Sequence, residues 1–434
     1  MPRSLPLLAA LLWCGACGSR EPGRNLLIVC VDTLRADELG AYGQTPSRTP
    51  ALDRLAAESV VFERAHASAS WTLPSVGSLF TSLFPSSTGL WTFESRLADS
   101  VTTLAERFRD AGYLTHGIAS HIFFDGKYGL QQGFQTFDEE LCHRKGEPGW
   151  RPVTAPEVSA RAVRWLDARE AADGRPWLLF VHFFDPHLDY LDHEAPSLDD
   201  TSRPERQRYR SEIAFTDRHV GALLEALERD GLAANTDVLF FSDHGESFLE
   251  HPPILRHSYS LYEEELRVPL FLRVPGVAPA RVAAFVRTVD LLPTLLELHG
   301  LPSPKAGECE GISLAPLLAG AGADAPRPPQ LAEIRLKDGF HANALLDGSL
   351  KLLEDVSKGR LALYDLATDP GERNDLAGQQ PERVRELEAA LRTLVRAAEE
   401  KGARLGAASA VSHTPEELEE IRRLGYAGED EPPR

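Results

Sequence analysis

Short apolar runs alternate with amphipathic stretches along most of the chain. Residues 25–31, 177–184 and 237–242 are almost continuously apolar, as strands buried on both faces of a sheet are. Stretches with the spacing of an amphipathic helix lie between these runs, at 49–62, 103–113, 156–169 and 218–231. The alternation predicts an α/β fold with a large, mixed but mainly parallel sheet sandwiched by helices.

The last quarter of the chain has a different pattern. Residues 341–355 contain an Asp-Gly turn signal between apolar residues and predict a hairpin, and residues 381–402 predict a long amphipathic helix. A Pro-, Gly- and Ala-rich stretch at 319–330 is typical of a linker or surface loop. We therefore expect a main α/β domain at 24–325, a smaller C-terminal sheet-plus-helix subdomain at 331–405, and a polar tail at 406–434 with a short helix at 415–424.

Composition narrows the function. The chain has 434 residues, 43% of them hydrophobic, which is enough for a large core with an appended subdomain. The net charge of −19 argues against nucleic acid as a partner, because its backbone needs a basic surface. An anionic substrate remains compatible with this charge if a metal or a few local cations hold it.

Residues 1–17 predict export. The apolar run 5–13 is too short to span a bilayer but fits a secretory signal. Small residues before Cys17 resemble a bacterial lipoprotein box, although Cys14 stands where Leu is usual. We expect a periplasmic or outer-surface envelope protein with a lipid anchor at Cys17; a plain cleaved signal peptide is the alternative.

The other cysteines are less informative about structure and function. Cys30 lies inside an apolar run and is expected to be a buried core thiol. Cys142 and Cys309 could pair in an oxidising compartment, and the sequence leaves this open.

Chemistry-bearing side chains follow the three apolar runs. In parallel sheets ligands bind beyond the carboxyl ends of the strands. The runs lead into Asp32, into Asp185 and His187, and into Asp243 and His244. Asp and His together suit a hard or borderline divalent cation. A lone Asp at a strand end more often caps the next helix, but the coincidence at three strands favours a metal site.

Thr72 allows two interpretations. In the stretch ASWTLPSVG it could cap a helix from about Pro74 to Leu83. It could also be a nucleophile, because a helix N-terminus and a nearby metal both favour an alkoxide. The pattern alone favours the cap.

Several segments resemble, in order, the sulfatase-like branch of the alkaline phosphatase superfamily. They include NLLIVCVDTLRADELGAYG, TLPSVGSLFTSLFPSSTG, FVHFFDPHLDY, FSDHGESFLEH and LYDLATDPGERNDLA, and the likeness extends over most of the chain. The resemblance implies a large α/β sandwich with a smaller C-terminal subdomain. It also implies metal ligands at Asp32, Asp243 and His244, with Thr72 as the nucleophile and a further ligand.

The resemblance suggests further site residues. His187 and His257 fall where the family contacts the transferred anion or the leaving oxygen; a surface histidine is an equal alternative for His257. Arg35 is expected to hold nearby carboxylates or the substrate. His182 fits a core histidine better than a site residue. Weaker candidates are Glu246 and His251.

Three departures from the sulfatase pattern matter. The Cys/Ser-x-Pro-x-Arg motif, whose first residue becomes formylglycine, is replaced by residues 72–76 with Thr first and Val last, so formylglycine is not expected. The second of two successive Asp is Thr33, and the Gly-Lys pair with the anion-clamping Lys aligns with Ala119 and Ser120.

We therefore expect an exported hydrolase or transferase that uses one divalent metal ion and Thr72 on phosphate, or sulfate, esters. The Asp-rich ligand set favours Ca²⁺, Mg²⁺ or Mn²⁺ over Zn²⁺. The substrate would be an anionic ester of a glycan, a lipid headgroup or a small molecule, selected by irregular insertions at 122–160 and 188–212. The alternatives are a sulfatase proper and a degenerate, non-catalytic envelope protein that binds a glycan or lipid headgroup.

Overall fold

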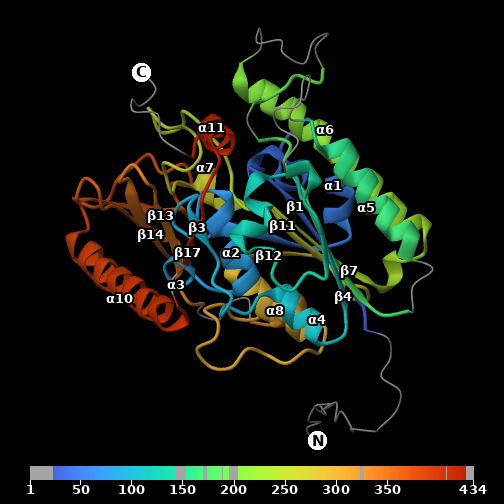
Figure 1. Cartoon of the computed structure of the whole chain (residues 1–434). Helices are drawn as coiled ribbons and strands as arrows, with labels where there is room; N and C mark the ends of the chain where they lie inside the picture. Colours follow the sequence, from blue (N-terminus) through green and yellow to red (C-terminus); the bar gives the residue numbers. More distant parts are fainter. Residues whose placement is uncertain are drawn as a thin grey trace, which may run out of the picture.

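The computed structural model describes residues 23–142, 153–169, 174–187, 189–194, 204–322, 327–406 and 408–426. Two sheets organise these residues, one large and mixed, the other small and antiparallel (Figure 1). The expected leader at 1–17 lies outside the described residues. Among the described helices, none has both the length and the apolar character needed to cross a membrane.

The large sheet has nine strands in the order β10-β2-β11-β7-β1-β6-β4-β5, with β12 beside β2. Its centre, β7-β1-β6-β4-β5, is parallel, and β10 and β11 run antiparallel to β2. This confirms the mixed, mainly parallel sheet. The strands are β1 (Asn25–Val31), β2 (Val60–His66), β4 (Leu114–Ile118), β5 (Thr136–Asp138), β6 (Trp177–Phe183), β7 (Thr236–Phe241), β10 (Arg267–Val268), β11 (Leu270–Arg273) and β12 (Ala280–Arg287).

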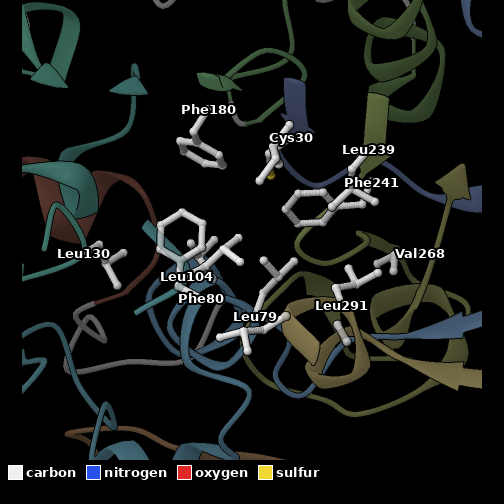
Figure 2. Close-up of a cluster of buried hydrophobic side chains, with 14 of the residues drawn as sticks. Cys30, Leu79, Phe80, Leu104, Leu130, Phe180, Leu239, Phe241, Val268 and Leu291 are labelled. Carbon is white, nitrogen blue, oxygen red and sulfur yellow. The ribbon is translucent and has the colours of Figure 1, made fainter. Parts of the chain in front are cut away.

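Helices cover both faces of this sheet. Alternate residues of β1 point to opposite cores, because successive side chains of a strand face opposite ways. Helices α2, α4 and α8 line one core, and α1, α5 and α6 line the other. In Figure 2, Leu79 and Phe80 of α2 lie in the first core with Cys30 and Phe241 of the sheet. The bounds are α1 (Pro50–Ala57), α2 (Thr72–Thr81), α4 (Leu104–Asp110), α5 (Ala155–Arg169), α6 (Glu205–Arg229) and α8 (Leu291–Leu298).

The small sheet joins four antiparallel strands, β13 (Gln330–Arg335), β14 (His341–Asp347), β15 (Leu350–Asp355) and β16 (Arg360–Asp365). β14 and β15 form the expected hairpin, and the amphipathic helix α10 (Pro381–Leu405) packs its apolar side on this sheet. The remaining elements are short. They are α3 (Pro85–Thr88), α7 (Glu263–Leu266), α9 (Ala315–Leu318), α11 (Pro415–Arg423), β3 (Ser95–Arg96), β8 (Ser247–Phe248), β9 (Leu255–Arg256) and β17 (Ser409–Ala410), with 3₁₀ turns at Ala36–Glu38, Gly40–Tyr42, Ile122–Phe124, Gly126–Tyr128, Glu140–Cys142, Ala233–Asn235 and Thr288–Asp290.

Two expected elements have different bounds. The helix expected at 49–62 ends at Ala57, because the β-branched residues that follow belong to β2. α6 begins at Glu205, so the end of the insertion expected to be irregular at 188–212 is helical.

Among the described residues, Cys30, Cys142 and Cys309 form no disulfide bond. Cys30 is fully buried, and burial raises the pKa of its thiol well above the usual value, as expected for a core cysteine. Cys142 and Cys309 do not pair. The Cys142 thiol donates to the carbonyl of Ala119, and the Cys309 thiol to that of Gly311.

Candidate active site

The carboxyl ends of three adjacent parallel strands form the site. β1 lies between β7 and β6 in the sheet, so the residues that follow these strands meet at one edge. Asp32 follows β1 directly, and Asp243 and His244 follow β7. One ligand atom from each of these three residues lies within 4.8 Å of the others, and all three side chains are fully buried.

The tautomer of His244 suits a metal ligand. Its Nδ1 donates to the carbonyl of Gly245 at 2.9 Å, which leaves the Nε2 lone pair free. His244 Nε2 lies 3.4 Å from Asp32 Oδ1 and 3.7 Å from Asp243 Oδ2. Ser75 Oγ of α2 donates to the Asp243 carbonyl at 2.6 Å and ties this strand end to the helix.

The three donors fit a divalent cation. Two carboxylates buried side by side repel each other and are expensive to desolvate without an opposite charge. Asp243 Oδ2 accepts no hydrogen bond from the described residues. A cation held by Asp32, Asp243 and His244 would offset this cost, and oxygen donors outnumber nitrogen in the set.

Thr72 is the first residue of α2, and Trp71 is its N-cap. The prediction that Thr72 caps a helix from Pro74 to Leu83 is therefore wrong: the helix starts two residues earlier and ends at Thr81. Thr72 Oγ1 lies 3.5 Å from His244 Nε2, beside the candidate metal ligands and in the positive field of the helix N-terminus.

Asp32 also lies near His121 and His187, with ligand atoms within 4.8 Å of one another. His121 Nδ1, however, accepts the backbone N–H of Phe123 at 3.1 Å. The ring hydrogen of neutral His121 is therefore on Nε2, which makes that nitrogen a donor to oxygen and not a metal ligand. His121 is not among the residues predicted from the sequence, although its position just after β4 places it at the same sheet edge.

His257 is buried and oriented by a carboxylate. It is 5% exposed, which excludes the surface alternative, and its Nδ1 donates to Glu246 Oε1 at 3.0 Å. Arg256 and Ser258 on either side both have positive φ, a conformation that costs free energy and often occurs at functional sites. The His257 ring stands 4.8 Å from that of His187, centroid to centroid.

Tyr426, which was not predicted from the sequence, connects these histidines. Its hydroxyl lies 3.1 Å from His187 Nε2, 3.2 Å from His257 Nε2 and 3.5 Å from His121 Nε2. Burial, followed by the negative charge of Asp32, raises the pKa of Tyr426 well above its usual value, so the phenol is neutral.

Arg35 does not point its donors at this cluster. Four of its five N–H groups donate to Asp37, Glu250 and the carbonyl of Glu246. Of the two expected roles, this network corresponds to holding nearby carboxylates. Asp185 accepts from Thr154 and Ala155 at the start of α5, which is the helix-capping alternative for a strand-end Asp.

Of two other histidines, the structure places His182 beside the site and His251 outside it. His182 Nε2 lies 3.5 Å from Asp32 Oδ2, so this residue adjoins the site and is more than a core histidine. Burial lowers the pKa of His182 to about 4, which keeps the ring neutral. His251 pairs with Glu264 at 2.7 Å and contacts the carbonyl of Glu372, outside the cluster.

Comparisons with known proteins agree with this fold. A family model described as Sulfatase matches residues 24–301, and one described as N-sulphoglucosamine sulphohydrolase, C-terminal, matches residues 257–401. The fold is that of a hydrolase in this group. The chain belongs to the sulfatase family.

The individual relatives have low sequence identity to this chain, but the matches cover most of both chains. The chain is 26% identical to a Delta 4,5-hexuronate-2-O-sulfatase of Bacteroides thetaiotaomicron, covering 85% of this chain and 87% of the relative. It is 27% identical to an ulvan-active sulfatase of Formosa agariphila, covering 83% and 78%. A solved 2-O GAG sulfatase superposes with a TM-score of 0.75 at 21% identity, covering 93% of this chain and 96% of that one.

Proposed function

We propose that this sulfatase-family hydrolase cleaves phosphate or sulfate esters through Thr72, with one divalent cation on Asp32, Asp243 and His244. The observation that carries the proposal is the convergence of three buried ligands within 4.8 Å and the Thr72 hydroxyl 3.5 Å from one of them. Retention of all four groups also argues against a degenerate binding protein.

The cation, when bound, would supply Lewis-acid stabilisation of negative charge and a lowered pKa for the adjacent hydroxyl. Thr72 Oγ attacks the phosphorus or sulfur of the ester, forming one O–P or O–S bond while the bond to the leaving oxygen breaks. His257, with Nδ1–H held by Glu246, has a basic Nε2 that takes the Thr72 proton and passes it to the leaving oxygen.

The second half of the reaction restores the enzyme. Water attacks the phosphorus or sulfur bound to Thr72 Oγ, the Oγ–P or Oγ–S bond breaks, and the proton that the water loses returns to Oγ through His257. His121 Nε2–H and His187 stabilise the oxygens of the transferred group. An alcohol in place of water would make the reaction a transfer.

Sulfate esters are the second candidate within the same site, and the relatives support them. The matched curated proteins are named for sulfate esters of a hexuronate and of ulvan, and one solved relative is in complex with D-glucosamine-2-N,6-O-disulfate. These names favour a sulfated glycan, whereas the unmodified Thr at position 72 favours a phosphate ester.

The decisive experiment compares wild type, Thr72→Ala and Thr72→Ser after loading with Ca²⁺, Mg²⁺, Mn²⁺ or Zn²⁺. Aryl phosphomonoesters, phosphodiesters, phosphonates and sulfates are the probes. Loss of the nucleophile should lower kcat/KM by at least about 1,000-fold, and Thr72→Ser, which keeps a hydroxyl, should retain measurable turnover.

Mass spectrometry of the peptide containing Thr72 separates the alternatives. A phosphate or sulfate group trapped on Thr72 during turnover supports the mechanism, whereas an oxidised residue 72 would support a modified-residue sulfatase. Full activity of Thr72→Ala would overturn the proposal.

We further propose that the protein is exported and lipid-anchored at Cys17. The proposal rests on the charged, apolar and small-residue pattern of residues 1–17. Metabolic labelling with a fatty-acid analogue should mark wild type and not Cys17→Ser; equal labelling of both would contradict the anchor.

A further inference from the structure

The C-terminal segment, residues 408–426, ends inside the site. Its strand β17 pairs with β3, and α11 leads the chain to Tyr426. In Figure 1, α11 (red) lies away from α10, against the main domain. Ile421, Leu424 and Tyr426 are buried in the same core cluster as α2, so the segment is packed there by apolar contacts.

The turn after α11 aims Tyr426 inward. Gly425 has φ of +86°, its N–H bonds the carbonyl of Arg422, and the N–H of Tyr426 bonds the carbonyl of Ile421. This pair of bonds is a Schellman motif, which ends a helix at a left-handed residue and reverses the chain. The local sequence therefore specifies the direction in which the tyrosine leaves the helix.

The Tyr426 hydroxyl stands where the transferred group must bind. The three Nε2 atoms of His121, His187 and His257 surround it. These are the groups that the proposed mechanism assigns to the ester. One oxygen position cannot hold both the phenol and the substrate.

The same side chain closes the approach to the nucleophile. Thr72, Asp32 and Asp243 are each 0% exposed. The ring of Tyr426 packs against Trp71, at 5.5 Å between centroids, and against Phe123, at 4.8 Å. In this conformation a substrate in solvent does not reach Thr72.

We propose that residues 408–426 are a built-in pseudosubstrate, whose Tyr426 hydroxyl occupies the oxygen-binding position and must withdraw before the ester binds. This inference rests on the proposed function, because that function defines the oxygen-binding position. The occupant is a neutral phenol and the incoming ester an anion, so the anion wins the competition once a cation is in place.

The outer attachments of the segment are compatible with withdrawal. Lys127 pairs with Glu417 at 2.6 Å, and Arg423 with Asp189 at 2.6 Å, all with partly exposed side chains. Such surface pairs contribute little to stability, so the segment is held mainly by its buried apolar tip.

The first test measures the affinity of metal-loaded, full-length protein for inorganic phosphate and for sulfate by calorimetry. Tyr426→Phe keeps the ring but removes the competing hydroxyl, and Gly425→Ala strains the turn without a clash, because no atom lies within 4 Å of the added Cβ. Both variants should bind phosphate or sulfate about ten-fold more tightly than wild type, because apparent affinity falls with the fraction of molecules whose site is closed.

Matched controls separate this effect from general loosening. Tyr259→Phe removes a phenol that bonds Asp338 outside the site, and Gly231→Ala strains a left-handed glycine with equally open space. Neither control should change the affinity. If Tyr426→Phe binds the anion as wild type does or more weakly, or if no variant binds phosphate or sulfate, the pseudosubstrate is overturned.

The second test follows the segment itself. Hydrogen exchange of the metal-loaded wild type should show faster exchange in α11 when phosphate is saturating; unchanged or slower exchange would overturn withdrawal. The two proposals fail separately. Activity of Thr72→Ala would disprove the role of Thr72 as nucleophile. The binding and exchange results test only the withdrawal of residues 408–426.

Discussion

Metal removal should destabilise the protein, because it leaves two buried carboxylates that repel each other. Asp32 and Asp243 are both 0% exposed and lie within 4.8 Å of each other, so their charges repel in the metal-free protein. At a free cation concentration of about 100 times Kd, binding to the folded state alone adds about 2.7 kcal/mol to the free energy of unfolding. At about 2.1 cal/mol/K per residue, 434 residues give an unfolding entropy of about 0.9 kcal/mol/K. The expected rise in Tm is therefore about 3 °C.

The assay is scanning calorimetry of chelator-treated protein with and without each cation. Asp243→Asn should lose the 3 °C shift, because it removes a ligand charge, and its metal-free Tm should equal or exceed that of metal-free wild type. Asp185→Asn is the matched control: this buried carboxylate ends the neighbouring strand but caps α5. With and without metal, its free energy of unfolding should be lower than that of wild type by about 1–2 kcal/mol. The metal should still raise its Tm by about 3 °C. A metal shift that survives Asp243→Asn, or disappears in Asp185→Asn, would refute the ligand assignment.

Three further predictions concern the carboxyl groups of Glu246 and Glu333 and the described cysteine thiols. Glu246→Gln should lower kcat about 10- to 100-fold and move the acid limb of the pH–rate profile, because the carboxylate orients a catalytic imidazole; an unchanged profile would contradict this. Burial raises the pKa of Glu333 to about 7, so the folded state holds its proton more tightly and the free energy of unfolding should fall as pH rises from about 4.5 to 7; denaturant titrations should show a flatter pH dependence for Glu333→Gln. Among the described cysteines, Cys309 should react with a thiol reagent in the native protein, and Cys30 and Cys142 only after unfolding.

The sequence predicted the parts of the site that local patterns encode. The sequence could place Asp32 and the Asp243–His244 pair together because each follows a recognisable buried strand, and adjacent parallel strands share an edge. The local pattern alone favoured a cap at Thr72, because N-cap and first-turn positions differ by one residue, which is less than a pattern resolves. Arg35 was ambiguous because its partners Glu246 and Glu250 are more than 200 residues away in sequence.

Tyr426 was out of reach for a related reason. It lies in a polar tail, and the contact with His121 joins residues 305 positions apart. The Leu-Gly-Tyr sequence at the end of α11 could have indicated the Schellman turn, but no local pattern shows what the tyrosine meets after that turn.

The charge of the site distinguishes one ester class from another. Asp32, Asp243 and Glu246 bring three negative charges, a divalent cation brings two positive ones, and His121 and His182 are neutral. No Lys or Arg hydrogen-bonds or pairs with Thr72 or Asp243 among the described residues. Counted over these groups, the loaded site carries a net negative charge.

A monoanionic ester should then be preferred over a dianionic one. Sulfate esters and phosphodiesters are monoanions, whereas a phosphomonoester becomes a dianion above about pH 6. One additional like charge at about 4 Å costs about 1–4 kcal/mol between bulk water and a protein surface, or about five-fold to several hundred-fold in binding. At pH 8, kcat/KM for aryl sulfate or aryl phosphodiester should exceed that for the aryl phosphomonoester by at least about five-fold, and the gap should narrow at pH 5.5. A preference for the phosphomonoester that holds at pH 8 would require a positive charge that the described site lacks, and would refute the charge balance.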